Sequence, residues 1–149
     1  MVDVNILIGD EIDGNLPVNS ESLKKYASEI LADNGITAGE YNIVYIGDEY
    51  MAELNRLYKN RLGTTDVLSF NLDNDHPEGV NGEVYISLDK AREQAHELGV
   101  PFEEEVVRLI THGLLHSAGK VHDTEEEYNA MREKTEKLVK SFFASGSVK

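Results

Sequence analysis

The chain has 149 residues, 40% of them hydrophobic, and a formal net charge of -14 at pH 7. That length suits one compact domain with a single core, so we expect residues 1–149 to form one domain. The chain has no cysteine, which excludes disulfides, zinc ribbons and thiol nucleophiles and leaves imidazole and oxygen as metal ligands. The negative charge disfavours broad electrostatic binding to nucleic acid or anionic lipid, because the long-range field repels both.

Neither a secretory leader nor a membrane span is apparent in the sequence. Residues 1–8 lack a basic stretch followed by a long apolar run, and no window approaches the roughly 20 apolar residues that a membrane span needs. We therefore expect a cytoplasmic protein with no membrane partner.

The first part of the chain alternates between strand and helix patterns. In chain order the patterns predict a strand at Val4–Ile8, a helix from Asn19 or Ser20 to Asn34-Gly35, a strand at Tyr41–Ile46 and a helix over Tyr50–Tyr58. Between the last two elements, Gly47-Asp48 interrupts the chain. Strand, cap and helix are the simplest account of this stretch.

Two short apolar runs follow, Asp66–Phe70 and Glu83–Ser87, joined by a polar loop over Asn71–Gly82. Adjacent runs joined by such a loop can pair antiparallel, whereas strands separated by helices are usually parallel. We therefore expect an α/β (α+β) fold with a mixed sheet.

The rest of the chain is predicted to be helical. The expected helices are Leu88–Leu98 ending at Gly99, a helix from Pro101 to Gly119, and one from Thr124 to Phe143, followed by a frayed tail at Ser145–Lys149. The last helix carries an apolar set made of Tyr128, Met131, Leu138, Phe142 and Phe143. We expect this set to pack on the domain rather than on a second copy, which makes the protein a monomer.

Three of the five histidines lie within one predicted helix and the turn that ends it. His112 and His116 are four residues apart, so their side chains project from one helix face in adjacent turns. Gly119 can stop the helix in a left-handed cap, which lets His122 approach from another direction. The spacing predicts that His112, His116 and His122 bind one metal ion.

Zinc is the metal that this ligand set favours. Three neutral imidazoles leave a fourth position for water, and bound zinc lowers the pKa of that water to about 7. Nickel, cobalt and copper also accept three imidazoles, so nickel is a substitute that the sequence leaves open. The other two histidines, His76 in the polar loop and His96 on a separate helix, are expected not to be ligands.

A zinc peptidase is an alternative enzyme for this pattern. Its His-Glu-x-x-His motif uses the glutamate as the general base. Here Gly113 occupies that position. Without the carboxylate the usual peptide hydrolysis lacks its proton acceptor, so the site is zincin-like in geometry only.

The stretch His112-Gly113-Leu114-Leu115-His116, followed by Gly119 and His122, resembles the His-Gly-x-Leu-His-x-x-Gly-x-x-His signature of the YbeY family, the bacterial rRNA maturation factors. Similar stretches elsewhere are Glu53-Leu54-Asn55, Tyr58, Thr65-Asp66-Val67-Leu68-Ser69-Phe70 and Gly82-Glu83-Val84-Tyr85-Ile86-Ser87. With the length, the resemblance covers essentially the whole chain.

The resemblance implies a mixed four-stranded sheet with helices packed on it and a three-histidine zinc site. It implies single-strand-specific endoribonuclease activity in the maturation of the 16S rRNA 3′ end and in ribosome quality control. The implied partners are single-stranded RNA, the rRNA of the small ribosomal subunit, and ribosomal proteins or assembly GTPases. It also suggests that the strand Glu83–Ser87 flanks the metal cleft and offers backbone groups to an extended substrate.

The resemblance also points to catalytic residues outside the histidines. After Tyr58 the family usually carries an arginine, whereas this chain has Lys59, with Arg61 two residues later. Lysine lacks the planar bidentate grip of arginine on phosphate. Either Lys59 acts as a point charge or Arg61 takes the role, and we favour Lys59. Asp66 either orients a water or a ligand, or caps the turn before its strand.

Two further positions bear on the site. Val121 stands where the family commonly has an aspartate before the third histidine, and Asp123 follows that histidine, so the partner that orients an imidazole is not assigned. Ser69, on a predicted strand, is expected to be structural rather than a substrate contact.

The acidity of the chain conflicts with an RNA substrate unless basic side chains gather at the metal. The candidates for such a cluster are Arg56, Lys59, Arg61, Lys90, Arg92, Arg108 and Lys120. A solvated helix face is the alternative interpretation of these residues. A second class of function is also open, in which the protein is a ribosome-assembly binding factor and the metal is mainly structural.

Overall fold

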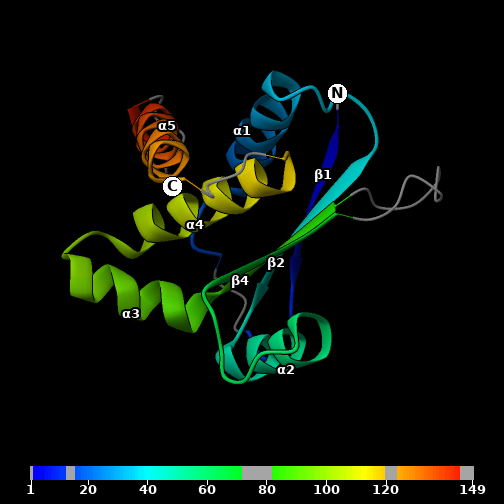
Figure 1. Ribbon diagram of the computed structural model, residues 1–149, viewed down its shortest axis with the longest axis vertical. Helices are drawn as coiled ribbons and strands as arrows, with labels where there is room; N and C mark the ends of the chain where they lie inside the picture. Colours follow the sequence, from blue (N-terminus) through cyan, green and yellow to red (C-terminus); the bar gives the residue numbers. More distant parts are fainter. Residues whose placement is uncertain (1, 13–15, 72–81, 120–123, 145–149) are drawn as a thin grey trace.

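Strands and helices alternate in the first half of the chain, and helices dominate the second half (Figure 1). The computed structural model describes residues 2–12, 16–71, 82–119 and 124–144. Its elements are β1 (Asp3–Ile8), α1 (Ser20–Asp33), β2 (Glu40–Ile46), α2 (Asp48–Lys59), β3 (Val67–Asn71), β4 (Gly82–Ser87), α3 (Leu88–Leu98), α4 (Phe102–Ser117) and α5 (Glu125–Ala144).

The four strands form one mixed sheet in the order β1-β2-β4-β3. β1, β2 and β4 run parallel, and β3 pairs antiparallel with β4. The expected mixed four-stranded sheet is therefore confirmed. The expectation that the strand Glu83–Ser87 offers backbone groups to a substrate is wrong. That strand, β4, pairs with β2 on one side and with β3 on the other, so its backbone groups already bond within the sheet. Within the described residues β3 is the edge strand on this side of the sheet, so β3 has the backbone groups to offer a substrate.

The two faces of the sheet carry separate apolar clusters. α1 and α4 cover one face, with α5 packed beyond them, and α2 covers part of the other (Figure 1). Successive side chains of a strand point to opposite faces of the sheet, so one strand contributes apolar residues to both clusters. On β2, Ile43 and Tyr45 join the large core beneath α1 and α4, whereas Val44 and Ile46 pack with Met51 of α2.

Side-chain caps fix several helix ends. The Asn19 side chain accepts a 2.9 Å hydrogen bond from the backbone N–H of Ser22, which begins α1 at Ser20 as predicted. Before α5, Thr124 and Glu127 bond reciprocally, each side chain to the other's backbone N–H, at 3.1 and 3.2 Å. α2 starts earlier than predicted, because Gly47 is its N-cap and acidic side chains fill its first turn.

α5 packs on the domain, as predicted. Met131, Val139 and Phe142 are buried in the large core, and the Phe142 ring meets the Tyr26 ring edge-on at 4.8 Å between centroids. Tyr128, at the start of the helix, is the exception, being 51% exposed. Among the described residues, no helix combines the length and apolar character needed to cross a membrane.

Candidate functional site

His112 and His116 present parallel rings on one face of α4. Their ring centroids are 6.4 Å apart and the ring planes differ by 16°. His112 is half-buried and His116 is exposed. The two imidazoles therefore face the same way from adjacent turns, as the four-residue spacing predicted.

The third predicted ligand, His122, lies outside the described residues, as do His76, Lys120, Val121 and Asp123. Where the structure describes the chain, no three potential ligands from histidine, aspartate and glutamate gather closely enough to hold a metal. The turn that leads to His122 does begin as predicted. Gly119 has φ +89° and donates its backbone N–H to the His116 carbonyl at 3.1 Å.

A zinc ion fits this donor set. Two imidazole rings aligned on one helix face are a usual arrangement for two zinc ligands, and Gly119, three residues after His116, has the positive φ typical of a helix end. His112, His116 and His122 remain the predicted ligands, and His96, on α3, remains a predicted non-ligand.

Gly113 brings α4 against the sheet. A Cβ atom at this position would lie 2.6 Å from Val84 Cγ1 and 3.1 Å from Val67 Cγ2. Position 113 thus faces β3 and β4, and a side chain fits there only if the helix or the neighbouring strand side chains shift. The structure gives a steric reason against the peptidase alternative, because a glutamate at this position has no room and faces the sheet.

Two hydrogen bonds fix α4 on either side of His112. Ser69 of β3 donates its hydroxyl to the Gly113 carbonyl at 3.0 Å, which gives Ser69 the structural role expected of it. The Tyr26 hydroxyl of α1 lies 2.6 Å from Thr111 Oγ1, and Thr111 donates its own proton to the Val107 carbonyl at 2.7 Å. Tyr26 is therefore the donor, and burial raises the pKa of its phenol to about 12.

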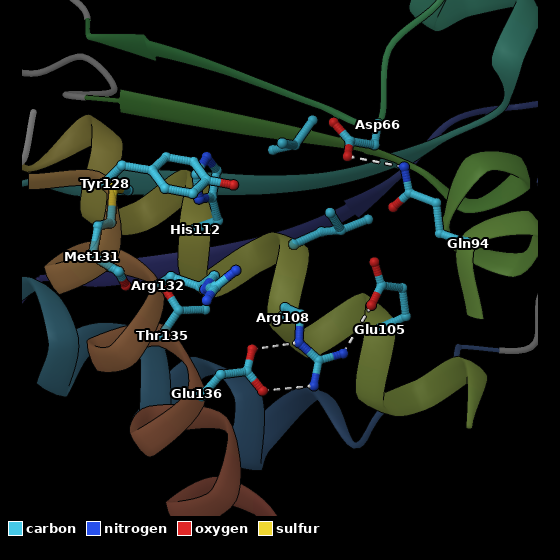
Figure 2. Close-up of a pocket in the computed structure, with 12 residues that line it drawn as sticks. Asp66, Gln94, Glu105, Arg108, His112, Tyr128, Met131, Arg132, Thr135 and Glu136 are labelled. Atoms are coloured by element: carbon cyan, nitrogen blue, oxygen red, sulfur yellow. Dashed lines mark hydrogen bonds and ion pairs between the residues drawn. The ribbon is translucent and has the colours of Figure 1, made fainter. Parts of the chain in front are cut away.

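A cavity of about 230 Å³ opens beside His112 (Figure 2). Its walls come from the start of β3 and from α3, α4 and α5. Asp66 lines it and accepts a 3.1 Å hydrogen bond from the Gln94 amide, so the structure brings Asp66 to the same cavity as His112. The opposite wall carries Tyr128 and Arg132 of α5.

Arg108 forms an ion-pair network in the floor of this cavity (Figure 2). It contacts Glu136 at 2.7 Å, Glu105 at 2.8 Å and Glu104 at 2.9 Å. The hydrogen bond to Glu136 is the largest of the contacts that raise the pKa of Arg108. The same bond lowers the pKa of Glu136. Burial raises the pKa of Glu105, against the opposing effect of Arg108.

Lys59 and Arg61 lie away from α4. The Lys59 ammonium is 5.2 Å from the Phe70 ring centroid, and Phe70 belongs to the small cluster on the α2 face. Arg61 follows the left-handed Asn60 at the end of α2 and is exposed. Lys59 therefore approaches β3 from the face opposite to the histidines.

Among the described members of the wider basic cluster, only Arg108 lines the cavity beside His112. Arg56 pairs with Glu53, Lys90 with Glu93, and Arg108 with three glutamates. Arg92 lies over the Phe102 ring at 4.4 Å. Among the described members of the predicted cluster, these four have partners on their own or adjacent helices, which favours the solvated-face interpretation for them.

The sequence did not predict that several residues line this cavity. Gln94, Glu105, Tyr128 and Arg132 belong to three helices whose relative packing no local pattern reveals. Glu105 lies in the acidic run Glu103–Glu105, which is typical of the first turn of a helix, yet its side chain is 3% exposed.

Comparison with known proteins decides the family. The family model described as Endoribonuclease YbeY matches residues 10–143. The chain belongs to the YbeY family. Among its curated relatives, "Endoribonuclease YbeY" of Carboxydothermus hydrogenoformans is 47% identical over 102 residues, covering 68% of this chain and 71% of the relative. The protein of the same name from Flavobacterium psychrophilum is 35% identical over 132 residues, covering 89% and 92%.

A solved structure supports the YbeY fold. The solution structure of a Thermotoga maritima protein aligns with a TM-score of 0.66 at 28% sequence identity, covering 95% of this chain and 90% of that one. Membership of the YbeY family indicates endoribonuclease activity for this chain. The histidine face of α4, with the adjoining cavity, is its candidate active site.

Proposed function

We propose that this protein is a single-strand-specific endoribonuclease that uses one zinc ion, held by His112, His116 and His122, in cytoplasmic maturation of the 16S rRNA 3′ end and in ribosome quality control. The observation that carries the proposal is the pair of parallel imidazoles on α4, 6.4 Å apart between centroids, beside an open cavity. Family membership supplies the reaction class.

Phosphodiester cleavage needs a nucleophile, neutralisation of the phosphoryl oxygens and protonation of the leaving oxygen. A bound zinc ion would supply Lewis-acid polarisation and an activated water near neutral pH. Asp66 is placed to accept a proton or to orient water, because its carboxylate lines the same cavity as His112 and is held by Gln94. Gln94 acts here as a positioning residue.

The substrate backbone runs along the outer edge of β3 in this proposal. β3 pairs only with β4 within the described residues, so its outer N–H and C=O groups face away from the sheet. Lys59, held over Phe70 of the same strand, supplies positive charge to a phosphate from the other side of that edge. Lys59 is preferred to Arg61 because its ammonium is held in place by a ring.

The test is cleavage of a labelled single-stranded RNA and of its duplex form by the purified protein. We expect zinc-dependent internal cleavage of the single strand, loss of cleavage on chelation, restoration by zinc, and little cleavage of the duplex. Cleavage that survives chelation contradicts the role of the metal. Equal cleavage of both forms contradicts the strand preference.

A His116→Ala variant separates catalysis from an assembly role. We expect this variant to lose RNA cleavage and to fail in cells to support 16S rRNA maturation, while circular dichroism shows an intact fold. If ribosome assembly in cells proceeds normally with the variant, the binding-factor function with a mainly structural metal replaces the proposal. A general protein substrate should remain uncut by the zinc-loaded protein.

A further inference from the structure

The cavity beside His112 has the walls of a base-binding pocket. We propose that it receives one nucleobase of the RNA, with guanine preferred, next to the phosphate that is cut. The inference rests on the proposed function, because it places that base beside the same histidines. It adds a sequence preference that the histidine motif alone does not contain.

The position and size of the cavity suit a base. His112 and Asp66 line its rim, and the start of β3 forms one side, so a strand along that edge passes its mouth. The volume of about 230 Å³ exceeds what one planar ring system fills. Figure 2 shows that Asp66, Gln94 and Glu105 point toward the same hollow, while Tyr128 covers the opposite side.

Electrostatics select a base over a phosphate for this cavity. The cavity lining carries three carboxylates, Asp66, Glu105 and Glu136, against two cations, Arg108 and Arg132. The Arg108 charge is already shared among ion pairs with Glu104, Glu105 and Glu136. A phosphate group entering this wall would meet a negative field, whereas a neutral base carrying N–H groups would find hydrogen-bond acceptors.

The acceptors favour guanine among the four bases. The Gln94 amide nitrogen already donates to Asp66 Oδ2, which leaves the Gln94 carbonyl oxygen as an acceptor toward the cavity. Glu105 is 3% exposed and uses its Oε1 for Arg108, so its other oxygen is on the cavity side in Figure 2. Guanine alone presents a ring N–H and an adjacent amino group to a carboxylate. Uracil has no amino group to offer.

Tyr128 supplies the stacking surface. Its side chain is 51% exposed at the start of α5, although Met131, Val139 and Phe142 on the same helix are buried. An aromatic ring over a base-sized cavity is the arrangement by which single-stranded nucleic acid is bound through its bases. Met131, one turn further along α5, closes the cavity below it.

The test is a titration of the isotopically labelled full chain, without zinc, with each of the four nucleosides, followed by NMR amide shifts. We expect guanosine to bind most tightly and uridine least, with shifts at Asp66, Gln94, Glu105 and Tyr128. Tyr128→Ala should weaken guanosine binding about thirtyfold, the middle of the range for base stacking. Gln94→Leu should reduce the preference for guanosine over uridine. Tyr58→Ala, which removes a tyrosine that is 66% exposed on the other face, should change neither.

This experiment can fail independently of the nuclease activity, because it measures binding without metal or cleavage. Shifts confined to other parts of the chain, equal binding of all four nucleosides, or an unchanged affinity in Tyr128→Ala would overturn the base pocket. Zinc-dependent cleavage with no preference for guanine at the cut would likewise overturn it while leaving the nuclease intact.

Discussion

The Ser69 hydroxyl on β3 donates a 3.0 Å hydrogen bond to the carbonyl oxygen of Gly113 on α4. This bond crosses from the edge strand to the helix that carries His112 and His116, at a residue between them that packs against the sheet. The edge strand and the histidine face are therefore fixed relative to each other, which is what a site that holds a strand of RNA beside a metal requires.

Ser69→Ala should lower the free energy of unfolding by about 1 kcal/mol, the usual net value of a hydrogen bond. Urea denaturation measures this. We expect KM for RNA to change less than kcat, because Ser69 holds the helix and does not touch the substrate. A large rise in KM with unchanged stability would instead make Ser69 a substrate contact.

Gly113→Ala should destabilise the fold by about 1–3 kcal/mol and lower zinc affinity, because the added Cβ overlaps Val84 Cγ1 and pushes α4 off the sheet. The matched control is the double variant with Val84→Ala, which removes the overlapping methyl groups. In a double-mutant cycle the second substitution should cost less in the Gly113→Ala background than alone. Additive effects would show that the overlap is not the cause.

Glu136→Gln should destabilise the protein at neutral pH and much less in acid. The hydrogen bonds from Arg108, helped by the charges of Arg132 and Lys140, lower the pKa of Glu136 from its ordinary 4.5. A lowered pKa in the folded state gives stability that is present above pH 4.5 and lost as the pH falls through the lowered value. Urea midpoints measured from pH 7 to pH 3 should therefore converge for the variant and the parent chain.

Glu133→Gln is the control for that comparison, because Glu133 is exposed on the same helix and no ion pair is seen for it in the described residues. Its effect on the urea midpoint should be small across the same pH range. A Glu136→Gln deficit that stays constant with pH would contradict the role assigned to the Arg108 network.

Lys59→Met should reduce cleavage of single-stranded RNA about 100-fold in kcat, since a positive charge near the reacting phosphate is lost. Arg61→Met, which removes a nearby charge that no ring holds in place, should reduce it less than about threefold. Single-turnover kinetics at saturating RNA measure both. The reverse order would transfer the role to Arg61, and no effect of either would leave the phosphate to the metal alone.

The sequence predicted the strands and helices well because their signals are local. The Asn19 cap, the β-rich run Tyr41–Ile46 and the left-handed Gly119 each depend on a few neighbouring residues. The histidine pair was predicted for the same reason, since a four-residue spacing on a helix fixes which side chains align.

The sequence alone did not predict which elements distant along the chain lie next to each other. The strand Glu83–Ser87 was expected at the cleft, but only the sheet order shows that it is interior and that β3 is at the edge. The meeting of Gln94, Glu105 and Tyr128 around one cavity depends on how three helices pack. The glutamates that pair with Arg108 also belong to two helices, α4 and α5. From the sequence alone, the Arg108 charge was therefore a candidate for contact with RNA.

The central claim is a zinc ion held by imidazoles of α4 and of the turn after it, and its most direct test is the zinc content of the purified chain after equilibrium dialysis. The account predicts about one zinc ion per chain in the parent and in His96→Ala, and far less in each of His112→Ala, His116→Ala and His122→Ala. A parent chain that retains no zinc, or a His116→Ala variant that retains as much as the parent, would contradict it.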